Sequence, residues 1–567
     1  MKKRWLFPNK NIEELKKDKR LTGVSDITLK VLVNRGYDTP EKIESFLFGT
    51  LENLHDTRLM QDAQKAIDIL KHSIKNGEQM VVYGDYDSDG VNSTVVMTDL
   101  LRKAGGNVGF YTNNRFTQGY GMMPSGVDEL LKLYPDTKLI ITVDNGIMAF
   151  EGVDYAKNLG LKVIVTDHHE QGDTIPNADA VVDPKRKDDE YPFKGLCGAG
   201  VAFKLMLLLF WEMELPLETV YDTLDIVAVA TVGDIVPLVD ENRVMVQKGL
   251  ELVRKEKRTL YKIFREVTGV KEVNAHYTFG FIYVPMLNAI GRLDGDPRRA
   301  IEMFFGEDEE LMRETITYLK GINDERKKMT EQQCERAEEM LREKGIKNVL
   351  VVYDESFHEG IVGLIAGRLK EKYNRPTFVF TKTESGLLKG SARSIDGFHL
   401  KKSFEELEAY IVGGGGHAKA AGLSIEEHMV EPFEQAMNEL ADKWLTEEDY
   451  IKKFHIDATI DANNVTIDIV DELKELEPYG ESFPKPILVM DNFQAKKPFY
   501  MGEQKNHVKL IGDFISLIMW RQAERYRAKG EPLSVRAIGY PELNVYNNRV
   551  SLQFTVDGDN YIDATKY

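Results

Sequence analysis

The sequence predicts an α/β protein of several domains: a parallel-sheet domain, a long connecting helix, a second α/β domain and a small C-terminal β-barrel. Three patterns predict this architecture. Strand-like and helix-like segments alternate from about residue 56 to 240 and again from about 345 to 445, a charged segment with few helix breakers runs from Asp308 to Lys344, and short strand-like runs dominate after residue 446. A chain of 567 residues also exceeds what one hydrophobic core organises. The predicted domains span residues 1–55, 56–244, 245–343, 344–445 and 446–567.

Composition restricts the class of protein but leaves its partner open. Hydrophobic residues make up 42% and charged residues 29% of the chain, which is typical of a globular protein. No segment reaches the roughly 18 consecutive apolar residues of a membrane span, and no apolar segment of a signal peptide follows the basic start Met1–Pro8. Two cysteines exclude a disulfide framework, so we predict a cytoplasmic location. The net charge of −18 argues against a general nucleic-acid coat, although it permits a local cationic groove.

The N-terminal 55 residues predict short helices, and the following region predicts a parallel sheet covered by helices. In such sheets, ligands bind beyond the carboxyl ends of the strands. The predicted N-terminal helices are Ile12–Lys19, Asp26–Arg35 and Pro40–Leu47; the predicted strands are Met80–Tyr83, Val108–Thr112, Leu139–Val143 and Lys162–Thr166; and the helices between them are Val91–Lys103, Ser125–Tyr134 and Ile147–Asn158.

Three alternating aspartates, Asp85, Asp87 and Asp89, follow the first predicted strand of this sheet. Three carboxylates at one strand end repel one another, so a hard cation such as Mg²⁺ or Mn²⁺ is the expected partner. An EF-hand calcium loop also begins with this pattern, but it needs a glutamate at its twelfth position, where this chain has Val96. An acidic turn without function is the other alternative.

Other candidate ligands follow later segments of the same region. Asp144 ends one predicted strand and His168 and His169 end another, while Asp234 follows a segment of small apolar residues. Alone, Asp144 could be a helix N-cap and the histidines could be surface residues. Together, carboxylates and imidazole at one edge form the mixed ligand set of a dinuclear hydrolase.

Four motifs in this order resemble the DHH phosphoesterase superfamily: Asp85–Gly90, Val143–Gly146, Asp167–His169 and Thr231–Asp234. The spacing and the flanking segments resemble the RecJ family of single-strand-specific 5′→3′ DNA exonucleases, in particular Asn114–Gly121 and Gly195–Lys204. The similarity extends over nearly the whole chain. It implies a parallel-sheet DHH domain, a long helix, a DHH-associated α/β domain and an OB-like barrel.

The resemblance also implies roles for the site residues. Asp144 would bridge two Mn²⁺ or Mg²⁺ ions roughly 3.5–4 Å apart. Asp85 and Asp87 would hold one ion and Asp89, His168 and Asp234 the other, although the division among the three aspartates stays open. Tyr83 stands where phosphatase branches have a histidine ligand, which suggests that Asp85 substitutes. The catalytic set is completed by His169, which would contact the scissile phosphate or assist the leaving oxygen, and the residues Asn145 and Asp167 would orient the ligands.

Substrate-binding residues are implied in the same way. Gly413–Gly416 and His417 are expected to open an alanine-rich helix whose backbone N–H groups bind phosphate, with a flexible joint as the alternative for the glycine run. Arg115, Ser391 and Arg393 resemble a 5′-phosphate pocket. Pro285–Arg292 resembles a conserved family segment, with Met286 and Ile290 as departures; Lys327 and Ser482-Phe483 are further departures. The implied substrate-binding residues are Arg115, Asn288, Arg292, Ser391, Arg393, Gly414, Gly415, Gly416 and His417.

Five short runs after residue 446 are compatible with an OB-like barrel, a fold that commonly binds single strands by stacking. They are Phe454–Ile460, Ile487–Asp491, His507–Leu510, Ser534–Ile538 and Arg549–Thr555.

We therefore expect an exonuclease that degrades single-stranded DNA from its 5′ end to 5′-mononucleotides in DNA repair and recombination. The implied partners are a single-strand-binding protein and a helicase, and we expect a monomer that does not bind membranes. One alternative is a nanoRNase, 3′-phosphoadenosine phosphatase or cyclic-dinucleotide phosphodiesterase of the same superfamily. Another is a non-catalytic replication scaffold.

Overall fold

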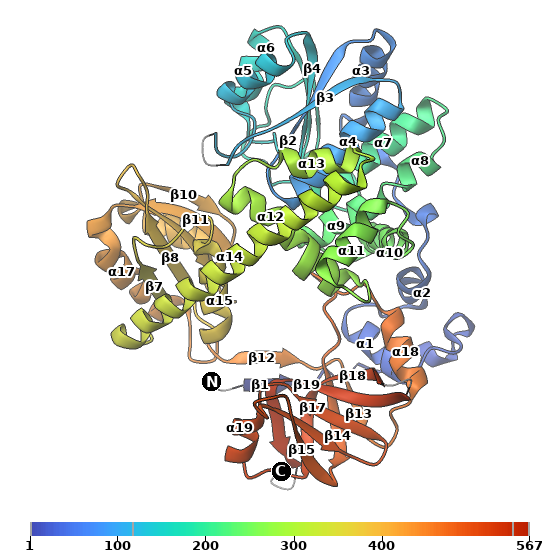
Figure 1. Cartoon of the computed structure of the whole chain (residues 1–567), viewed down its shortest axis with the longest axis vertical. Coiled ribbons are helices and arrows are strands. Elements are labelled where there is room, and N and C mark those ends of the chain that lie inside the picture. Colours follow the sequence, from blue (N-terminus) through green and yellow to red (C-terminus); the bar gives the residue numbers. More distant parts are fainter. Residues whose placement is uncertain (1–2, 9, 116–117, 547–548, 565–567) are drawn as a thin grey trace.

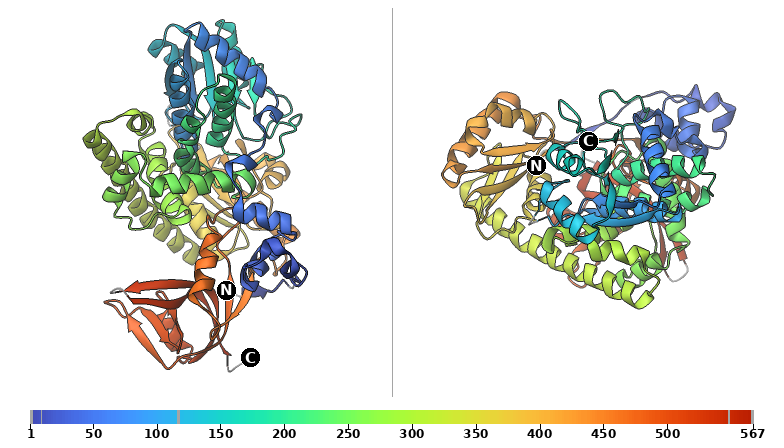
Figure 2. Two further views of the ribbon diagram at one scale, coloured as in Figure 1. Left: turned by 90° about the vertical axis from the view of Figure 1, so that its right-hand side faces the viewer. Right: turned by 90° about the horizontal axis from the view of Figure 1, so that it is seen from above.

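The computed structural model describes residues 3–8, 10–115, 118–546 and 549–564. It forms three lobes, in which the first α/β lobe and the second α/β lobe are joined by one long helix and the C-terminal barrel lies at the other end of the molecule (Figure 1). That helix, α14 (Glu309–Lys344), has 36 residues and begins where Asp308 accepts hydrogen bonds from the backbone N–H groups of Glu310 and Leu311. Seen from above, α14 runs along one side of the molecule between the two α/β lobes (Figure 2). The predicted connecting helix is therefore present.

The first lobe contains a five-stranded sheet in the order β3-β2-β4-β5-β6, and every neighbouring pair is parallel, as predicted. Both faces are covered by helices, and a separate hydrophobic cluster fills each face. The strands are β2 (Gln79–Gly84), β3 (Asn107–Thr112), β4 (Thr137–Val143), β5 (Lys162–Thr166) and β6 (Ala180–Val182), and the helices are α3 (Ala63–Lys75), α4 (Ser88–Lys103), α5 (Pro124–Leu133), α6 (Phe150–Asn158) and α7 (Gly198–Glu212).

Helices between the first sheet and α14 pack into the same hydrophobic core as the sheet. This core includes Leu139 of β4 as well as Ile290, Ile301 and Leu319. The domain boundary predicted between residues 244 and 245 falls inside α10. The elements are α8 (Glu218–Tyr221), α9 (Leu224–Gly233), α10 (Asp240–Arg254), α11 (Thr259–Thr268), the π-helical segment η5 (Ala275–Tyr283), α12 (Val284–Leu293) and α13 (Arg298–Phe305).

The second lobe is a mixed five-stranded sheet in the order β10-β11-β9-β8-β7. It corrects one expectation, because the glycine run forms strand β10 (Gly413–Gly416) and the alanine-rich segment forms strand β11 (Ala420–Ile425) instead of a helix. Residues in β11 alternate between more buried and more exposed positions, and the strand pairs with a neighbour on each side, so its backbone groups are satisfied without a helix. The other elements are β7 (Leu350–Tyr353), β8 (Thr377–Lys382), β9 (Leu388–Arg393), α15 (Val362–Tyr373), α16 (Leu400–Glu406) and α17 (Val430–Trp444).

The C-terminal lobe is a seven-stranded sheet that matches the predicted OB-like barrel. Strands β15 and β17 were not predicted, because they alternate with turns too short to separate by composition. The strand predicted over Phe454–Ile460 is instead split between β12 (Lys452–His455) and β13, which belong to different sheets. The elements are β13 (Ala458–Asp461), β14 (Leu488–Gln494), β15 (Lys497–Met501), β16 (His507–Ile511), β17 (Ile515–Met519), β18 (Ser534–Tyr546), β19 (Arg549–Asp563), α18 (Ile467–Glu475) and α19 (Ala523–Ala528).

The N-terminal segment packs against this barrel and is not wholly helical. Strand β1 (Lys3–Leu6) pairs in parallel with β12 (Lys452–His455), and only two 3-10 turns occur where the helix Ile12–Lys19 was expected. The helices α1 (Asp26–Asn34) and α2 (Pro40–Phe48) agree with expectation and share a core with the barrel. Met1 and Lys2 lie outside the described residues. Among the helices that the structure describes, none combines the length and apolar character needed to cross a bilayer.

Candidate metal centre and substrate cleft

The register of the first sheet brings three predicted motifs to one edge. Gly84 of β2 is paired with Val143 of β4, and Val143 is paired with Thr166 of β5. The next residue of each strand therefore begins the polar edge, which consists of Asp85, Asp144 and Asp167. Strand pairing thus brings together motifs that are separated by about 60 and about 20 residues in the sequence.

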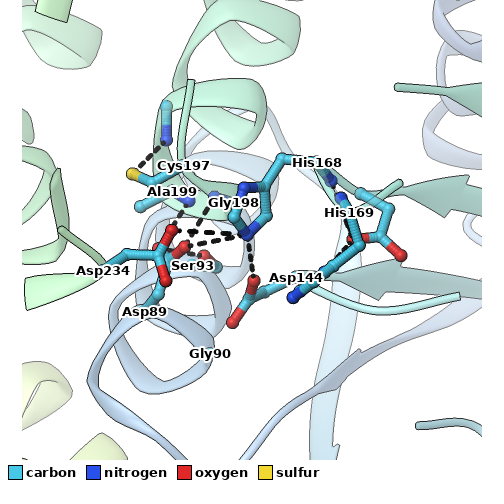
Figure 3. A network of polar contacts seen from close by, with 12 residues as sticks. Asp89, Gly90, Ser93, Asp144, His168, His169, Cys197, Gly198, Ala199 and Asp234 are labelled. Atoms are coloured by element: carbon cyan, nitrogen blue, oxygen red, sulfur yellow. Dashed lines mark hydrogen bonds and ion pairs between the residues drawn. The ribbon is translucent and has the colours of Figure 1, made fainter. Parts of the chain in front are cut away.

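The imidazole of His168 lies at the centre of this edge, between three carboxylates (Figure 3). Its Nε2 is 3.0 Å from Oδ1 of Asp144 and 3.6 Å from Oδ2 of both Asp89 and Asp234. Asp234 reaches this position because it follows the C-terminal end of α9. The structure therefore unites His168 and Asp234 with the Asp85–Asp89 and Asp144 motifs.

Helix N-termini hold two of the aspartates in place. Asp87 is the N-cap of α4, where its Oδ1 accepts hydrogen bonds from the backbone N–H groups of Asp89 and Gly90. The carboxylate of Asp89 accepts hydrogen bonds from the N–H groups of Gly198 at 2.6 Å and Ala199 at 2.9 Å, at the start of α7. Peptide donors and the positive end of a helix stabilise a carboxylate anion. This explains why the Gly195–Lys204 segment accompanies the acidic motifs.

The ligand atoms fall into overlapping groups whose members lie within 4.8 Å of one another. One group contains Asp85, Asp87 and Asp144, another contains Asp89, His168 and Asp234, and a third contains Asp144 with both histidines. Asp144 and His168 each belong to two groups. Two cation positions that share Asp144 would use the atoms of the first two groups, and carboxylate oxygens with one imidazole form a donor set that suits Mn²⁺ or Mg²⁺.

The electrostatics of the site call for cations. Burial and the charge of Asp89 raise the pKa of Asp144 well above its ordinary value, and the same two causes raise the pKa of Asp234 to about 8. His168 does not compensate, because burial lowers its pKa to about 4. Within the described residues, no lysine or arginine forms an ion pair with these carboxylates, and Asp85 Oδ1 and His168 Nδ1 are buried without a hydrogen-bond partner. These residues therefore fit a pair of divalent cations.

Tyr83 points away from this group, as expected for a poor ligand. Its hydroxyl donates a hydrogen bond to Oδ1 of Asn113. Asp85, the residue that follows β2, is therefore the candidate ligand at the end of this strand. Asn145 donates from its amide to the carbonyls of Tyr83 and Val143, which ties the ends of β2 and β4 together. This contact orients the backbone below the site.

His169 is held by Asp167 at the mouth of the site. Nδ1 of His169 is 2.7 Å from Oδ1 of Asp167, which also accepts hydrogen bonds from the N–H groups of both histidines. Burial lowers the pKa of His169, but the hydrogen bond and charge of Asp167 outweigh it and raise the pKa to about 9. The imidazole is therefore a cation at neutral pH, and it is more exposed than His168.

The second lobe forms the opposite wall of this site. A cavity of about 530 Å³ is lined by Tyr120, Asp167 and His169 from the first lobe and by Gly415, Gly416 and His417 from the second. The glycines belong to an exposed strand and not to a helix start, so the expected helix-terminal phosphate site is absent from the described residues. Backbone of β10 and the imidazole of His417 nevertheless face His169 across the cavity.

A second group of predicted residues forms an arginine cluster at the junction of the lobes. Burial and the charges of Arg115 and Arg326 lower the pKa of Arg292 to about 10, and Arg393 adds to this effect. Arg393 donates a hydrogen bond to Oγ of Ser391 at 3.1 Å. The charge of Asp87 opposes the lowering of the pKa of Arg292, but no carboxylate of the described residues forms an ion pair with these four guanidinium groups, so they form a site for anions.

Other predicted residues have structural partners. Oδ1 of Asn288 accepts a hydrogen bond from the backbone N–H of Ser88, which fixes the turn that bears the aspartates. Met286 is buried in the core and does not face a substrate, and Lys327 pairs with Asp324 on an exposed helix face. Phe483 is buried between Phe46 and Tyr479. In the Asn114–Gly121 segment, Phe116 and Thr117 lie outside the described residues.

Three residues near the site were not singled out from the sequence. The hydroxyl of Tyr120 is 3.3 Å from Nδ1 of His169, and the Nε of Arg326 is buried without a hydrogen-bond partner in the described structure. Asp183 follows β6, and burial and Asp167 raise its pKa to about 7. Asp183 could have been predicted as a site residue from the sequence, because it is a carboxylate that directly follows a strand. Arg326 and Tyr120 are recognised only through their neighbours in space.

Comparison with known proteins gives matches along the whole chain. Residues 79–231 match the DHH family, N-terminal domain, residues 347–447 match the DHHA1 domain, and residues 456–558 match the RecJ OB domain. The single-stranded-DNA-specific exonuclease RecJ of Bacillus subtilis is 34% identical over 564 residues, which cover 98% of this chain and 70% of that protein. The protein of the same description from Escherichia coli is 33% identical and covers 85% of each chain. The crystal structure of RecJ in complex with Mn²⁺ from Thermus thermophilus has the same fold, with a TM-score of 0.84 at 24% identity over 99% of this chain and 80% of that one.

Proposed function

The chain belongs to the RecJ family, and from this premise we propose that it is a metal-dependent exonuclease that degrades single-stranded DNA from the 5′ end to 5′-mononucleotides, in DNA repair and recombination. The observation that carries the proposal is the convergence of Asp144, His168 and Asp234 from three segments, with Nε2 of His168 within 3.6 Å of both carboxylates. In a core with only a structural role, apolar residues would pack at a lower free-energy cost than an imidazole surrounded by buried carboxyl groups.

The two predicted cation positions would be held by Asp85 and Asp87 on one side and by Asp89, His168 and Asp234 on the other, with Asp144 between them. When bound, divalent cations stabilise the charge that develops on phosphate oxygens and provide a nucleophile at neutral pH. The protein supplies the fixed geometry: helix starts hold Asp87 and Asp89, and strand ends hold Asp144 and His168. Preorganised ligands need no rearrangement when the substrate arrives.

His169 acts on the substrate side of the site. Its Nδ1 is engaged by Asp167, so its Nε2–H is the group that donates to a phosphate oxygen or to the leaving 3′ oxygen. The raised pKa keeps this proton in place at neutral pH. Asp167 is a positioning residue, because it fixes the ring orientation through one carboxylate oxygen.

Degradation from the 5′ end requires that the enzyme recognise this end of the strand, and the arginine cluster would provide that recognition. Arg115, Arg393 and Ser391 would grip a 5′-phosphate, since guanidinium groups bind phosphate oxygens in pairs of hydrogen bonds. Arg115 is supported by the ring of Tyr86, whose centroid lies 5.2 Å from its guanidinium carbon. The barrel would hold the strand on the 3′ side of this pocket by stacking. A single-strand-binding protein and a helicase remain predicted partners.

The sibling phosphodiesterases of the superfamily are the alternative enzyme class. The RecJ OB domain over residues 456–558 favours the exonuclease, because a substrate of one or two nucleotides needs no additional strand-binding barrel. A non-catalytic scaffold is disfavoured by the complete set of acidic and imidazole groups.

The test is digestion of 3′-labelled and 5′-phosphorylated single strands with Mn²⁺, with Mg²⁺ and with EDTA. We expect mononucleotide release from the 5′ end of the single strand, little from a blunt duplex or a free dinucleotide, and none in EDTA. Faster cleavage of dinucleotides than of long strands would favour the sibling class. Absence of hydrolysis under all metal conditions would favour the scaffold.

A further inference from the structure

An exposed aromatic edge lies on the π-helical segment η5, beside the catalytic lobe. One side of this segment is buried in the core through Thr278, Phe279 and Tyr283. The other side exposes Tyr277 and Phe281, each with 58% of its surface accessible. Large aromatic residues this exposed have lost most of the benefit of burial, and π-helical turns often occur at functional sites.

Phe281 faces a cavity of about 450 Å³ that adjoins the proposed metal centre. The cavity lining includes the apolar or aromatic residues Phe281, His276 and Ile235 and the charged residues Arg292, Arg326, Lys485 and Glu481. Gly233 and Ile235, the two neighbours of Asp234, both belong to this lining. The ring of His276 meets the ring of Phe281 edge to face, with centroids 5.3 Å apart.

The aromatic and the cationic residues of this lining match the base and the phosphate of a nucleotide, respectively. A flat apolar base is accommodated by an aromatic side chain, and the adjacent phosphate by guanidinium groups. Arg326 has a buried Nε without a hydrogen-bond partner among the described residues, and Arg292 is buried beside further positive charge. The unpartnered Nε of Arg326 is therefore available to an anion, and Arg292, which donates from Nη1 to the carbonyl of Gly360 at 3.2 Å, adds positive charge beside it. The two arginines would also attract an acidic peptide. A nucleotide, however, additionally presents a flat base that can stack on the ring of Phe281.

We propose that this cavity is a nucleobase subsite, in which a base close to the scissile phosphate stacks on the ring of Phe281, beside His276, while its phosphate contacts Arg292 and Arg326. The proposal rests on the nuclease function above and deepens it. Any of the four bases can stack on a ring, so the subsite is indifferent to sequence.

The subsite also gives a physical reason for single-strand specificity. A base enters the cavity only after it has left its own stack and its pairing partner. In a duplex, that step costs a few kcal/mol for each base, whereas a single strand pays much less of this cost. The subsite would therefore discriminate against duplex even where the backbone could reach the metal centre.

The first experiment measures binding without metal, so that it does not depend on catalysis. A 5′-phosphorylated single strand with 2-aminopurine at successive positions is titrated with the full-length protein in EDTA, and fluorescence reports stacking. We expect quenching at one or two positions near the 5′ end. Phe281→Ala should remove that quenching and weaken binding about tenfold, since one base–ring stack contributes on that order.

Trp211→Ala is the control, because Trp211 is similarly exposed, at 56%, near the end of α7 and is not among the described residues that line the cavity. It should bind as the wild type does. Unchanged quenching in Phe281→Ala, or equal losses in both variants, would overturn the subsite.

A second experiment uses the wild-type protein and so remains informative if a variant fails to fold. An abasic nucleotide is moved along the strand, and the initial rate with Mn²⁺ is measured at each position. One position should slow the wild type about tenfold and leave Phe281→Ala unaffected. A flat profile in an active wild-type enzyme would refute the subsite alone. An inactive wild type on every strand would refute the nuclease proposal together with the inference built on it.

Discussion

Nε2 of His168 lies 3.0 Å from Oδ1 of Asp144, although the two residues are 24 positions apart in the chain. Each follows the end of its own strand, and the parallel register of β4 and β5 sets the distance between them. Because burial lowers the pKa of His168 to about 4, the imidazole is neutral and does not balance the carboxylates around it. The positive charge that the site requires must come from bound cations.

Asp144→Asn should abolish metal-dependent hydrolysis while leaving the fold intact. We expect a loss of more than about 100-fold, since removing groups that only orient metal ligands already costs about 10–100-fold. The metal-free variant should unfold at the same or a higher temperature than wild type, because it lacks one buried like charge. Mn²⁺ should raise the melting temperature of the wild type and not that of the variant.

Asp99→Asn serves as its control. Asp99 lies on α4, as Asp89 does, but pairs with Lys103 at the surface. Wild-type activity and a normal Mn²⁺ shift are expected from it. A normal Mn²⁺ shift in Asp144→Asn would contradict the role of Asp144 as a ligand.

Gly198→Ala should impair activity through a steric effect on Asp144. A Cβ atom at position 198 would lie 2.6 Å from Cβ of Asp144 and 2.9 Å from its Cα, so one of the two segments must move. The same glycine donates its N–H to Asp89. We expect at least about a tenfold fall in kcat and a destabilisation of about 1–3 kcal/mol from overpacking, measured by initial rates and urea unfolding.

Gly321→Ala is the matched substitution in α14, where a Cβ atom would meet no atom within 4 Å. It should keep full activity and stabilise the protein by about 0.5–1 kcal/mol, because alanine is the better helix former. Equal activity of the two variants would show that close approach at position 198 is not needed.

Arg393→Ala should remove the preference for 5′-phosphorylated ends. Arg393 contacts Ser391 and lies within the arginine cluster, where burial lowers its pKa. A charge-assisted hydrogen bond contributes about 1.5–3 kcal/mol, so kcat/KM on a phosphorylated strand should fall at least about tenfold. The rate on a strand with a 5′-hydroxyl should change little.

The comparison for this variant is Arg375→Ala. Arg375 belongs to the same lobe, but its guanidinium stacks on Tyr450 at 3.8 Å. Its loss should not alter the end preference. If Arg393→Ala slowed both substrates equally, Arg393 would be assigned to general DNA binding and not to the 5′ pocket.

The pH dependence of stability should report the buried pair of Asp225 and Arg258, joined at 2.8 Å. Burial raises the pKa of Asp225 from 3.8 to about 6, despite the opposing charge of Arg258. The folded state therefore binds this proton more tightly than the unfolded state, and the resulting stability is present below the unfolded pKa and is lost as pH rises through about 6.

Urea unfolding of wild type and Asp225→Asn from about pH 4 to pH 7 tests this expectation. The wild type should lose up to about 3 kcal/mol relative to the variant as pH rises, at 1.4 kcal/mol for each unit of pKa shift. Above about pH 7 the difference should be constant. A difference that is constant over the whole range would mean that the pKa of Asp225 is not raised.

Local patterns in the sequence were sufficient for much of the fold. The alternation of apolar strands and amphipathic helices gave the parallel sheet, and the absence of breakers gave α14, because hydrophobic periodicity and propensity act over a few neighbouring residues. The glycine-rich run was misassigned for the same reason. Its conformation is set by pairing between β10 and β11 and by the pairing of β11 with β9, contacts that composition does not encode.

The sequence by itself determined which residues have the chemistry: the motif aspartates, His168 and His169 stand out by type, order and position after strands. Only the tertiary structure decided which of them meet. Register placed Asp144 beside His168, and helix packing brought Gly198 and Asp234 to the same site. The packing of α12 on α14 and of η5 on α9 placed Arg326 near Arg292 and Phe281 near Ile235. The physical reason is that distances across strands and between helices depend on long-range packing, whereas the identity of a ligand depends on one side chain.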